Sequence, residues 1–267
     1  MLTNTRSDRV RSVRALARRA VRVRSGRFVV DGPQGVREAV RYAADRVLDV
    51  YVTADAAQRH PDVVRAATDA GLRVHEASDE VLAAMSGTEA PQGLVAVVHD
   101  EPVHLGEVLN AAPRLLVLLA HVRDPGNAGT VIRGADALGA DAVLVSEASV
   151  DVHAPKVVRS TAGSLFHLPV LTGLDLSTTL ADLRAHGIRL LAADGSGRTA
   201  LPDADLSGPH AWVMGNEAWG LPEAVRDACD DVVRVPITGH AESLNLAMAA
   251  TLCLYASSVA WSRDGSR

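Results

Sequence analysis

Short apolar runs that stop at turn-forming residues constrain the fold of this chain more than any other feature. Ala211–Met214 is one such run and ends at Gly215-Asn216-Glu217, while Val232–Val235 is another and ends at Pro236–Gly239. Segments with helical spacing separate further runs of this kind, at Leu115–Ala120, Ala142–Ser146, Phe166–Leu171 and Ile188–Ala193. Strands that alternate with helices predict an α/β fold with a mostly parallel sheet. Ligand sites in such sheets form where strands end, so both turn clusters are candidates.

The chain divides into two predicted domains. Its 267 residues, 48% of them hydrophobic, suit one or two domains with a sizeable core. The segments between Arg27 and His99 form a compact α/β unit in which no catalytic cluster is evident. Asp100–Pro113 carries scattered polar residues and two prolines, which is typical of a connection between domains. We therefore predict domains at residues 1–104 and 105–267.

The N-terminal segment is strongly basic in a chain of net charge −5. Residues 1–27 hold nine arginines against one acid. Four of these arginines follow helical spacing, namely Arg11, Arg14, Arg18 and Arg22. Such asymmetry predicts contact with a polyanion such as RNA. The alternative is an amphipathic surface helix whose charged face is only solvated.

Several classes of function are excluded by missing patterns. No run reaches the roughly 18 apolar residues of a membrane span, and the N-terminus lacks the apolar region of a signal peptide, so we expect a cytoplasmic protein. Cys229 and Cys253 show no CxxC spacing, and the ten histidines show no ligand spacing, so no metal is expected. Asp194–Gly197 resembles a phosphate loop but lacks its third glycine, and we interpret it as an ordinary loop.

Two helix starts in the second domain carry polar residues. Asn127 follows the turn Asp124-Pro125-Gly126 and is a plausible N-cap. Arg133 lies six residues further on, near the middle of the same predicted helix and on a different face. Ser243-Leu244-Asn245 opens a long apolar helix, in which Ser243 is a second plausible cap. An arginine on an otherwise apolar helix is a poor core residue, which favours a functional role for Arg133.

Three stretches together resemble the motifs of a known family. They read N-A-G-T-V-I-R-G-A-D-A-L-G-A (127–140), M-G-N-E-A-W-G-L-P (214–222) and V-P-I-T-G-H-A-E-S-L-N-L-A (235–247). Their order and spacing resemble the SpoU/TrmH family of RNA ribose 2′-O-methyltransferases, in the SPOUT superfamily, across the whole second domain. The first domain looks like the L30e-like substrate-binding domain of that family. Asn216, Ala218 and Trp219 depart from the residues that other members often carry in the second motif.

The resemblance implies an L30e-like RNA-binding domain followed by a SPOUT α/β domain with a trefoil knot. It implies S-adenosyl-L-methionine as cofactor, bound by backbone atoms, and a homodimer. By motif position, the implied cofactor contacts are Gly215, Val235 and Leu244, with Ile237 as a neighbour. The functional polar residues that the resemblance implies are Asn127, Arg133, Glu217, Ser243 and Asn245.

Arg133 is the proposed base in the family, but arginine stays protonated in proteins. We favour a clamp that holds the target phosphate and stabilises charge developing on the ribose oxygen.

Large-subunit ribosomal RNA is the substrate that we predict, because a separate N-terminal domain is present. The alternatives are a transfer RNA 2′-O-methyltransferase, a non-catalytic RNA-binding protein on the same fold, and a nucleotide-dependent dehydrogenase. The last would require a glycine fingerprint after the first strand, and none is present.

Overall fold

The computed structural model describes residues 1–88 and 91–263, and packing divides it into two compact units. The first unit consists of Met1–Pro102 together with Asp151–His167. The second consists of Val103–Val150 and the chain from Leu168 onward. The segment Asp151–His167 thus packs with the N-terminal unit although the sequence places it within the predicted second domain.

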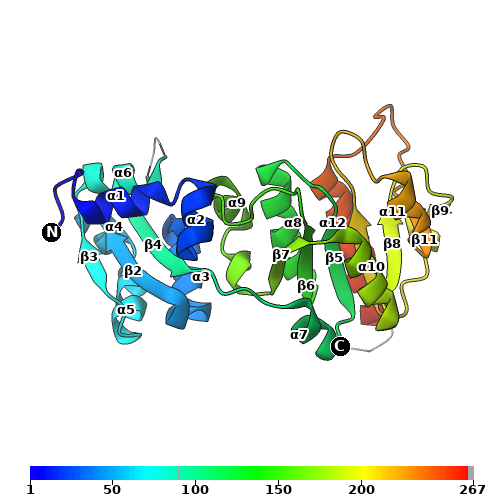
Figure 1. Ribbon diagram of the computed structural model, residues 1–267, viewed down its shortest axis with the longest axis horizontal. Coiled ribbons are helices and arrows are strands. Elements are labelled where there is room, and N and C mark those ends of the chain that lie inside the picture. Colours follow the sequence, from blue (N-terminus) through cyan, green and yellow to red (C-terminus); the bar gives the residue numbers. More distant parts are fainter. Residues whose placement is uncertain (89–90, 264–267) are drawn as a thin grey trace. The chain divides into compact units, whose positions relative to one another are not determined.

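A four-stranded sheet in the order β1-β4-β2-β3 forms the centre of the first unit (Figure 1). β4 is antiparallel to both β1 and β2, and β2 is parallel to β3. The strands are β1 (Arg27–Asp31), β2 (Val47–Val52), β3 (Val74–Glu76) and β4 (Leu94–His99). The helices are α1 (Asp8–Ala15), α2 (Arg19–Ser25), α3 (Pro33–Tyr42), α4 (Ala54–Arg59), α5 (Pro61–Asp69), α6 (Asp79–Ser86) and α9 (Pro155–Thr161).

The basic N-terminal segment forms two helices, so its four arginines with helical spacing do not lie on one continuous helix. α1 begins at its cap Ser7, whose side chain accepts from the Val10 amide, and α2 begins only at Arg19. Val10 and Val13 are buried against the sheet in one cluster with Val29, because residues three apart lie on the same side of a helix. The N-terminal helices are therefore part of the packed unit and not an appended arm.

A seven-stranded sheet forms the centre of the second unit, and each of its strand pairings in the described chain is parallel. Its order, β7-β6-β5-β10-β8-β11-β9, confirms the predicted parallel α/β fold. The strands are β5 (Leu115–Leu119), β6 (Ala142–Ser146), β7 (Val170–Leu174), β8 (Arg189–Ala193), β9 (Thr199–Ala200), β10 (His210–Met214) and β11 (Asp231–Arg234). The helices are α7 (Leu105–Asn110), α8 (Pro125–Ala137), α10 (Leu176–Ala185), α11 (Glu223–Asp227) and α12 (Leu246–Arg263).

Alternate residues of the central strand β10 face different helices. Ala211 and Val213 belong to a buried cluster with Leu180 of α10. Trp212 lies between them and donates from its Nε1 to the Ser257 hydroxyl of α12 at 2.9 Å, so α12 covers the opposite face. α8 packs against α12 on that same side (Figure 1). Both faces of β10 are thus covered, which explains the unbroken apolar run Ala211–Met214 within it.

Three boundary predictions were wrong. The strand predicted at Phe166–Leu171 begins at Val170, because residues Ser164–Phe166 form a short 3-10 turn. The predicted connection contains the helix α7, whose Val108 and Leu109 are buried in the core of the second unit. The last helix begins at Leu246 and not at Ser243.

Within the described ranges, no helix is both long and apolar enough to cross a bilayer. The same residues contain no group of three or more His, Cys, Asp or Glu side chains suited to holding a metal ion.

Candidate active site

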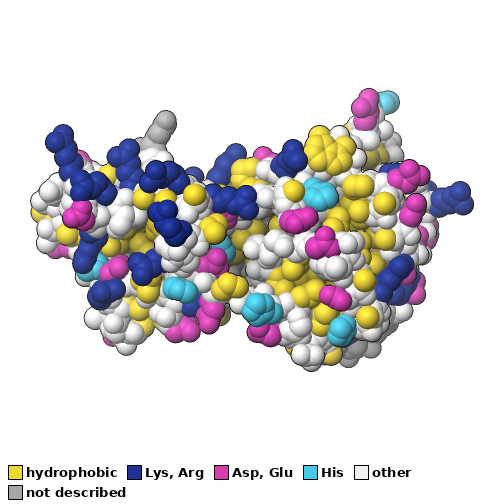
Figure 2. All heavy atoms as spheres, in the orientation of Figure 1, with side chains coloured by type: hydrophobic (Ala, Val, Ile, Leu, Met, Phe, Trp, Pro, Cys, Tyr) yellow, Lys and Arg dark blue, Asp and Glu magenta, His cyan; other side chains and the backbone are white. Residues whose placement is uncertain are grey.

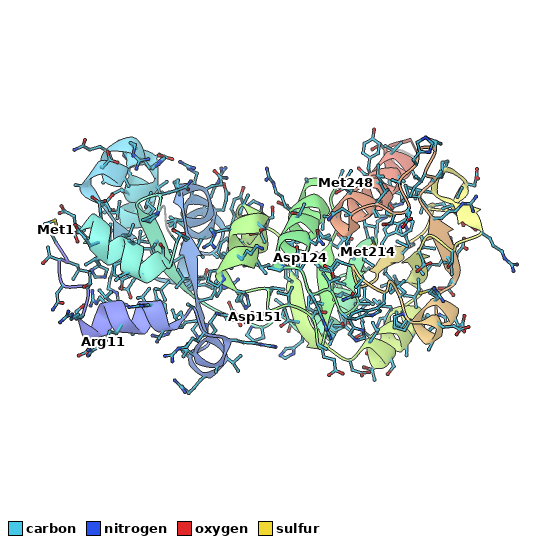
Figure 3. All side chains as sticks on the ribbon, turned by 90° about the horizontal axis from the view of Figure 1, so that it is seen from above. Met1, Arg11, Asp124, Asp151, Met214 and Met248 are labelled. Atoms are coloured by element: carbon cyan, nitrogen blue, oxygen red, sulfur yellow. The ribbon has the colours of Figure 1, made fainter. Side chains whose placement is uncertain are left out.

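One cavity of about 520 Å³ lies in the second unit, where β8, β10 and β11 end. Chain segments that follow these strands meet the starts of α8 and α12 there. Figure 3 labels Asp124 before α8, Met214 at the end of β10 and Met248 in α12. These three elements lie around the cavity. The strand-end position agrees with the general rule for ligand sites in parallel sheets.

The cavity collects eight of the residues that the motifs single out. They are Asn127, Gly215, Glu217, Val235, Ile237, Ser243, Leu244 and Asn245. Arg133 does not line it. Its side chain is exposed on α8, and among the described residues it has no ion-pair or hydrogen-bond partner. The structure therefore separates the candidate cofactor residues from the candidate clamp within one chain.

Glu217, Asn127 and Asn245 form a hydrogen-bonded brace between the three motifs. The Glu217 carboxylate accepts from the Asp124 amide at 3.1 Å and from the Asn127 side-chain amide at 3.2 Å. Asn245 Nδ2 donates to Asn127 Oδ1 at 2.9 Å. The start of α8 supplies amide donors and a positive helix end, which suits the negative charge of Glu217. These hydrogen bonds connect the three chain segments that form this side of the cavity.

The caps of α8 and α12 differ from those predicted. Asp124 caps α8 by accepting from the Asn127 amide at 2.7 Å, so Asn127 lies inside the helix. Asn245 Oδ1 accepts from the amides of Ala247 at 2.9 Å and Met248 at 3.4 Å, which makes Asn245 the cap of α12. Ser243 lies before this cap, exposed at the cavity rim. The cap interpretation of Asn127 and Ser243 was therefore wrong, because the Asn127 side chain instead bonds Glu217 and Asn245.

Gly215 and the buried Asn216 shape the loop after β10. A Cβ built on Gly215 would lie 2.5 Å from the Gly220 carbonyl carbon and 2.6 Å from the Leu221 nitrogen. Glycine is thus required by the loop itself, whether or not a cofactor is bound. Asn216 Nδ2 donates to the His121 carbonyl at 2.7 Å and ties this loop to the end of β5. Its position beside a required glycine was the only signal for this role in the sequence.

Asp194 is a cavity residue that the sequence analysis missed. It follows β8 directly, and its position at the end of a buried parallel strand was the available signal. Burial raises the pKa of Asp194, but hydrogen bonds from the hydroxyl and amide of Ser196 and the nearby Arg226 outweigh burial and lower the pKa below its usual value. The cavity therefore contains an ionised carboxylate at neutral pH.

The four arginines predicted to contact RNA separate into two groups. Arg11, Arg14 and Arg18 are exposed in the first unit, in the region of α1 and α2 where Figure 2 shows many basic side chains. Arg22 is only 7% exposed and forms a 2.6 Å ion pair with Asp151. Its guanidinium also donates to the Leu16 carbonyl at 2.7 Å. We withdraw Arg22 as an RNA contact, because its donors are used within the fold.

Comparison with known proteins accounts for both units. Residues 114–255 match the model of the SpoU rRNA methylase family, and residues 7–96 match the MRM3-like substrate binding domain. The chain is 34% identical over 235 residues to the 23S rRNA (guanosine-2′-O-)-methyltransferase RlmB of Bordetella pertussis, covering 86% of this chain and 96% of that protein. It is 29% identical over 254 residues to the 23S rRNA (guanosine(2553)-2′-O)-methyltransferase RlmP of Bacillus subtilis, covering 95% and 97%.

Solved structures agree over nearly the whole chain. The SpoU methyltransferase AviRb from Streptomyces viridochromogenes in complex with AdoMet has a TM-score of 0.84 at 30% identity, over 97% of this chain and 100% of that one. The AdoMet-bound rRNA methyltransferase from Sinorhizobium meliloti also has a TM-score of 0.84, at 27% identity over 96% of each chain. The fold and site define a methyltransferase of the α/β class. The chain belongs to the SpoU rRNA methylase family.

Proposed function

We propose that this protein transfers a methyl group from S-adenosyl-L-methionine to a ribose 2′-hydroxyl of large-subunit ribosomal RNA. The observation that carries this proposal is the meeting of three separate motif segments at one cavity, with Glu217, Asn127 and Asn245 hydrogen-bonded together. The relatives RlmB and RlmP are both named for guanosine in 23S rRNA, which makes a guanosine the expected target. A dehydrogenase is excluded by the family membership.

The residues of the cavity fit S-adenosylmethionine. Its volume of about 520 Å³ lies in the usual range for a site that holds one small molecule. Val235, Ile237 and Leu244 supply apolar surface for a flat adenine, and the Asp194 carboxylate can accept from hydroxyl or amino groups. Backbone groups of Gly215, Val235 and Leu244 would hold the cofactor. The bound cofactor supplies an electrophilic methyl group on a sulfonium.

The remaining work of the protein is to position the ribose oxygen and stabilise its developing charge. Arg133 suits this role because its guanidinium stays protonated and can grip a phosphate through two parallel hydrogen bonds. We assign Arg133 to a phosphate next to the target ribose, where it also stabilises negative charge on the 2′-oxygen. The proton of that hydroxyl leaves to water or to a carboxylate. We assign Ser243, which is exposed at the cavity rim, to contact with the same nucleotide.

A homodimer would bring the clamp and the cavity together. Met248, Leu252 and Tyr255 are all exposed on α12, and their spacing of four and three residues places them on one apolar stripe. α8, which carries Arg133, packs against the same helix. We propose that this stripe packs on a second copy, so that Arg133 of one copy serves the cavity of the other.

The first unit is proposed to bind the RNA around the target nucleotide. The match of residues 7–96 to a substrate binding domain supports this role, as do the exposed Arg11, Arg14 and Arg18. Ribosomal RNA as substrate supports a cytoplasmic location. The trefoil knot and the L30e-like form of the first unit stay predictions.

Methyl incorporation tests the proposed activity directly. The protein is incubated with methyl-labelled S-adenosylmethionine and either 23S rRNA or transfer RNA, both from a host that lacks the enzyme. Digestion to nucleosides should give labelled 2′-O-methylguanosine from the 23S rRNA. Label in transfer RNA alone would replace the proposed substrate with the transfer RNA alternative, and no label in either RNA would favour a non-catalytic binding protein.

Mixing two inactive variants tests the shared site. Arg133→Ala and Glu217→Ala should each be inactive alone, and unfolding and refolding them together should restore activity. Restoration requires that the two residues come from different copies in one site. A mixture that stays inactive would contradict the composite site.

A further inference from the structure

Trp219 is the exposed member of the three tryptophans of this chain. Trp212 and Trp261 are 0% and 2% exposed, whereas Trp219 is 53% exposed. Its loop is well fixed, because the backbones of Asn216 and Gly220 exchange two hydrogen bonds of 2.9 Å. The fold therefore presents a large apolar ring to water on a rigid turn. Exposed tryptophans in such positions are typical of binding sites.

Arg123 lies over this ring and connects it to the cavity. Its guanidinium carbon is 5.0 Å from the centroid of Trp219, a cation–π arrangement. The Arg123 amide donates to the Glu217 carboxylate at 3.3 Å, and Glu217 lines the cavity. One set of contacts thus holds an aromatic ring, a guanidinium and the candidate active site together.

We propose that Trp219 and Arg123 form a binding site for one unpaired RNA base and its phosphate beside the reaction centre. The inference rests on the proposed function, because the site lies at the rim of the cavity assigned to methyl transfer. An aromatic ring accepts the face of a base, and a guanidinium pairs with phosphate. Arg123 lies over the ring, and Trp219 as a whole residue still stays 53% exposed to solvent.

Stacking, and not general apolar contact, is the chemistry that this site offers. A base stacked on an aromatic side chain contributes enough free energy that its loss weakens binding by roughly tenfold. Trp219 is thus a positioning residue: it holds the nucleotide while other groups act on the ribose. Its loss should raise the KM for RNA and leave cofactor affinity intact.

Steady-state methylation of 23S rRNA by three Trp219 variants tests this chemistry. Trp219→Ala should raise the KM about tenfold, Trp219→Phe should stay near the wild type, and Trp219→Leu should behave like alanine because it is apolar but cannot stack. Calorimetric affinity for S-adenosylmethionine should be equal in all four proteins. An unchanged KM in Trp219→Ala, or full rescue by leucine, would overturn the stacking site. A parallel loss of cofactor affinity would instead make Trp219 a support of the cavity.

Tryptophan fluorescence provides a readout that does not depend on turnover. Iodide should quench the emission of Trp219 selectively, since the other two tryptophans are buried. Single-stranded oligoadenylate should quench the same fraction and protect it from iodide, while an abasic oligomer with the same phosphates should not. Trp219→Phe should remove the whole response. Equal quenching by the abasic oligomer, or a response that persists in Trp219→Phe, would contradict base stacking.

The phosphate half of the site is tested by the salt dependence of RNA binding. Arg123→Gln keeps the backbone donor to Glu217 and removes the charge. The slope of log K against log salt should fall by about one, the value expected for one phosphate contact. An unchanged slope would remove Arg123 from the site. If the wild-type protein methylates no RNA, the proposed function fails. The fluorescence response to oligoadenylate tests the base site separately, because it does not depend on methylation.

Discussion

The α1–α2 region of the first unit and the cavity of the second unit use polar residues differently. Around α1 and α2 the sequence offers a row of arginines, yet Arg22 is buried against Asp151 while its neighbours stay exposed. Around the cavity, Glu217 and Asn245 hold segments of backbone, and the exposed Arg133 lies outside. Spacing along the sequence therefore does not separate the two roles, whereas burial and hydrogen bonding show which polar side chains support the fold and which stay exposed.

The N-terminal arginines should differ most in what they contribute to the free energy of unfolding. Arg22→Met should lower the free energy of unfolding by about 3 kcal/mol, because it removes the close ion pair of the poorly exposed Asp151 carboxylate and leaves only the exposed Arg19, 3.9 Å away, as a cationic partner. Arg18→Met, the matched change at an exposed position, should alter stability by less than about 0.5 kcal/mol. Urea unfolding of both variants measures the difference. Equal, small losses in the two variants would show that Arg22 is as dispensable as its exposed neighbours.

Two glycines that line the cavity differ in the space around them. A Cβ on Gly215 collides with backbone atoms, so Gly215→Ala should cost about 1–3 kcal/mol of stability. A Cβ on Gly195, which also lines the cavity, meets no atom within 4 Å, so Gly195→Ala should unfold like the wild type. Thermal unfolding without cofactor separates the two. Equal stability of Gly215→Ala and Gly195→Ala would contradict a structural requirement for Gly215.

Asp31 in the first unit should lower the stability of the fold at neutral pH, so that replacing it gives a smaller effect and a gain in stability. Its side chain is 7% exposed, and its Oδ1 has no hydrogen-bond partner among the described residues. Burial raises the pKa of Asp31, and Arg159 only partly opposes this. Because the folded state holds this proton more tightly, its stability should fall as the pH rises from the ordinary aspartate pKa of about 4 through the raised value.

The substitution Asp31→Asn should remove this fall in stability with rising pH. We expect a gain of about 1 kcal/mol at neutral pH that disappears in acid, measured by urea unfolding across pH. Asp62→Asn is the matched control, since Asp62 is exposed and the hydrogen bond from Arg37 lowers its pKa. A loss of stability in Asp31→Asn at neutral pH would show that its ion pair with Arg159 outweighs the burial of charge.

The smallest expected effect concerns the exposed arginines. Changing Arg11, Arg14 and Arg18 together to Gln should reduce the salt slope of RNA binding by about one for each phosphate that these side chains neutralise. Cofactor affinity should not change. Deleting residues 1–27 would not be a clean test, because Val10 and Val13 are part of the core of the first unit. A slope equal to that of the wild type would place RNA binding elsewhere.

Local patterns predicted the parallel sheet, whereas the residues that line the cavity were expected from the resemblance of three stretches to the SpoU/TrmH motifs. Apolar strands such as Leu115–Leu119 and motif glycines such as Gly215 are visible without tertiary contacts. The partner of Arg22 was not predictable, since Asp151 is 129 residues away along the chain. Asn216 and Asp194 were missed for the same reason, because their roles depend on which loops meet at the ends of the strands.

Arg133 lies outside the cavity, so its loss should affect the reaction and leave cofactor binding intact. Single-turnover methylation across pH is measured for wild type, Arg133→Lys and Arg133→Ala, together with calorimetric affinity for S-adenosylmethionine. Both variants should bind the cofactor like the wild type and lose at least about two orders of magnitude in rate, because lysine lacks the planar fork. A lysine variant near the wild-type rate, with its pH profile shifted to lower pH, would contradict the clamp and make Arg133 a base.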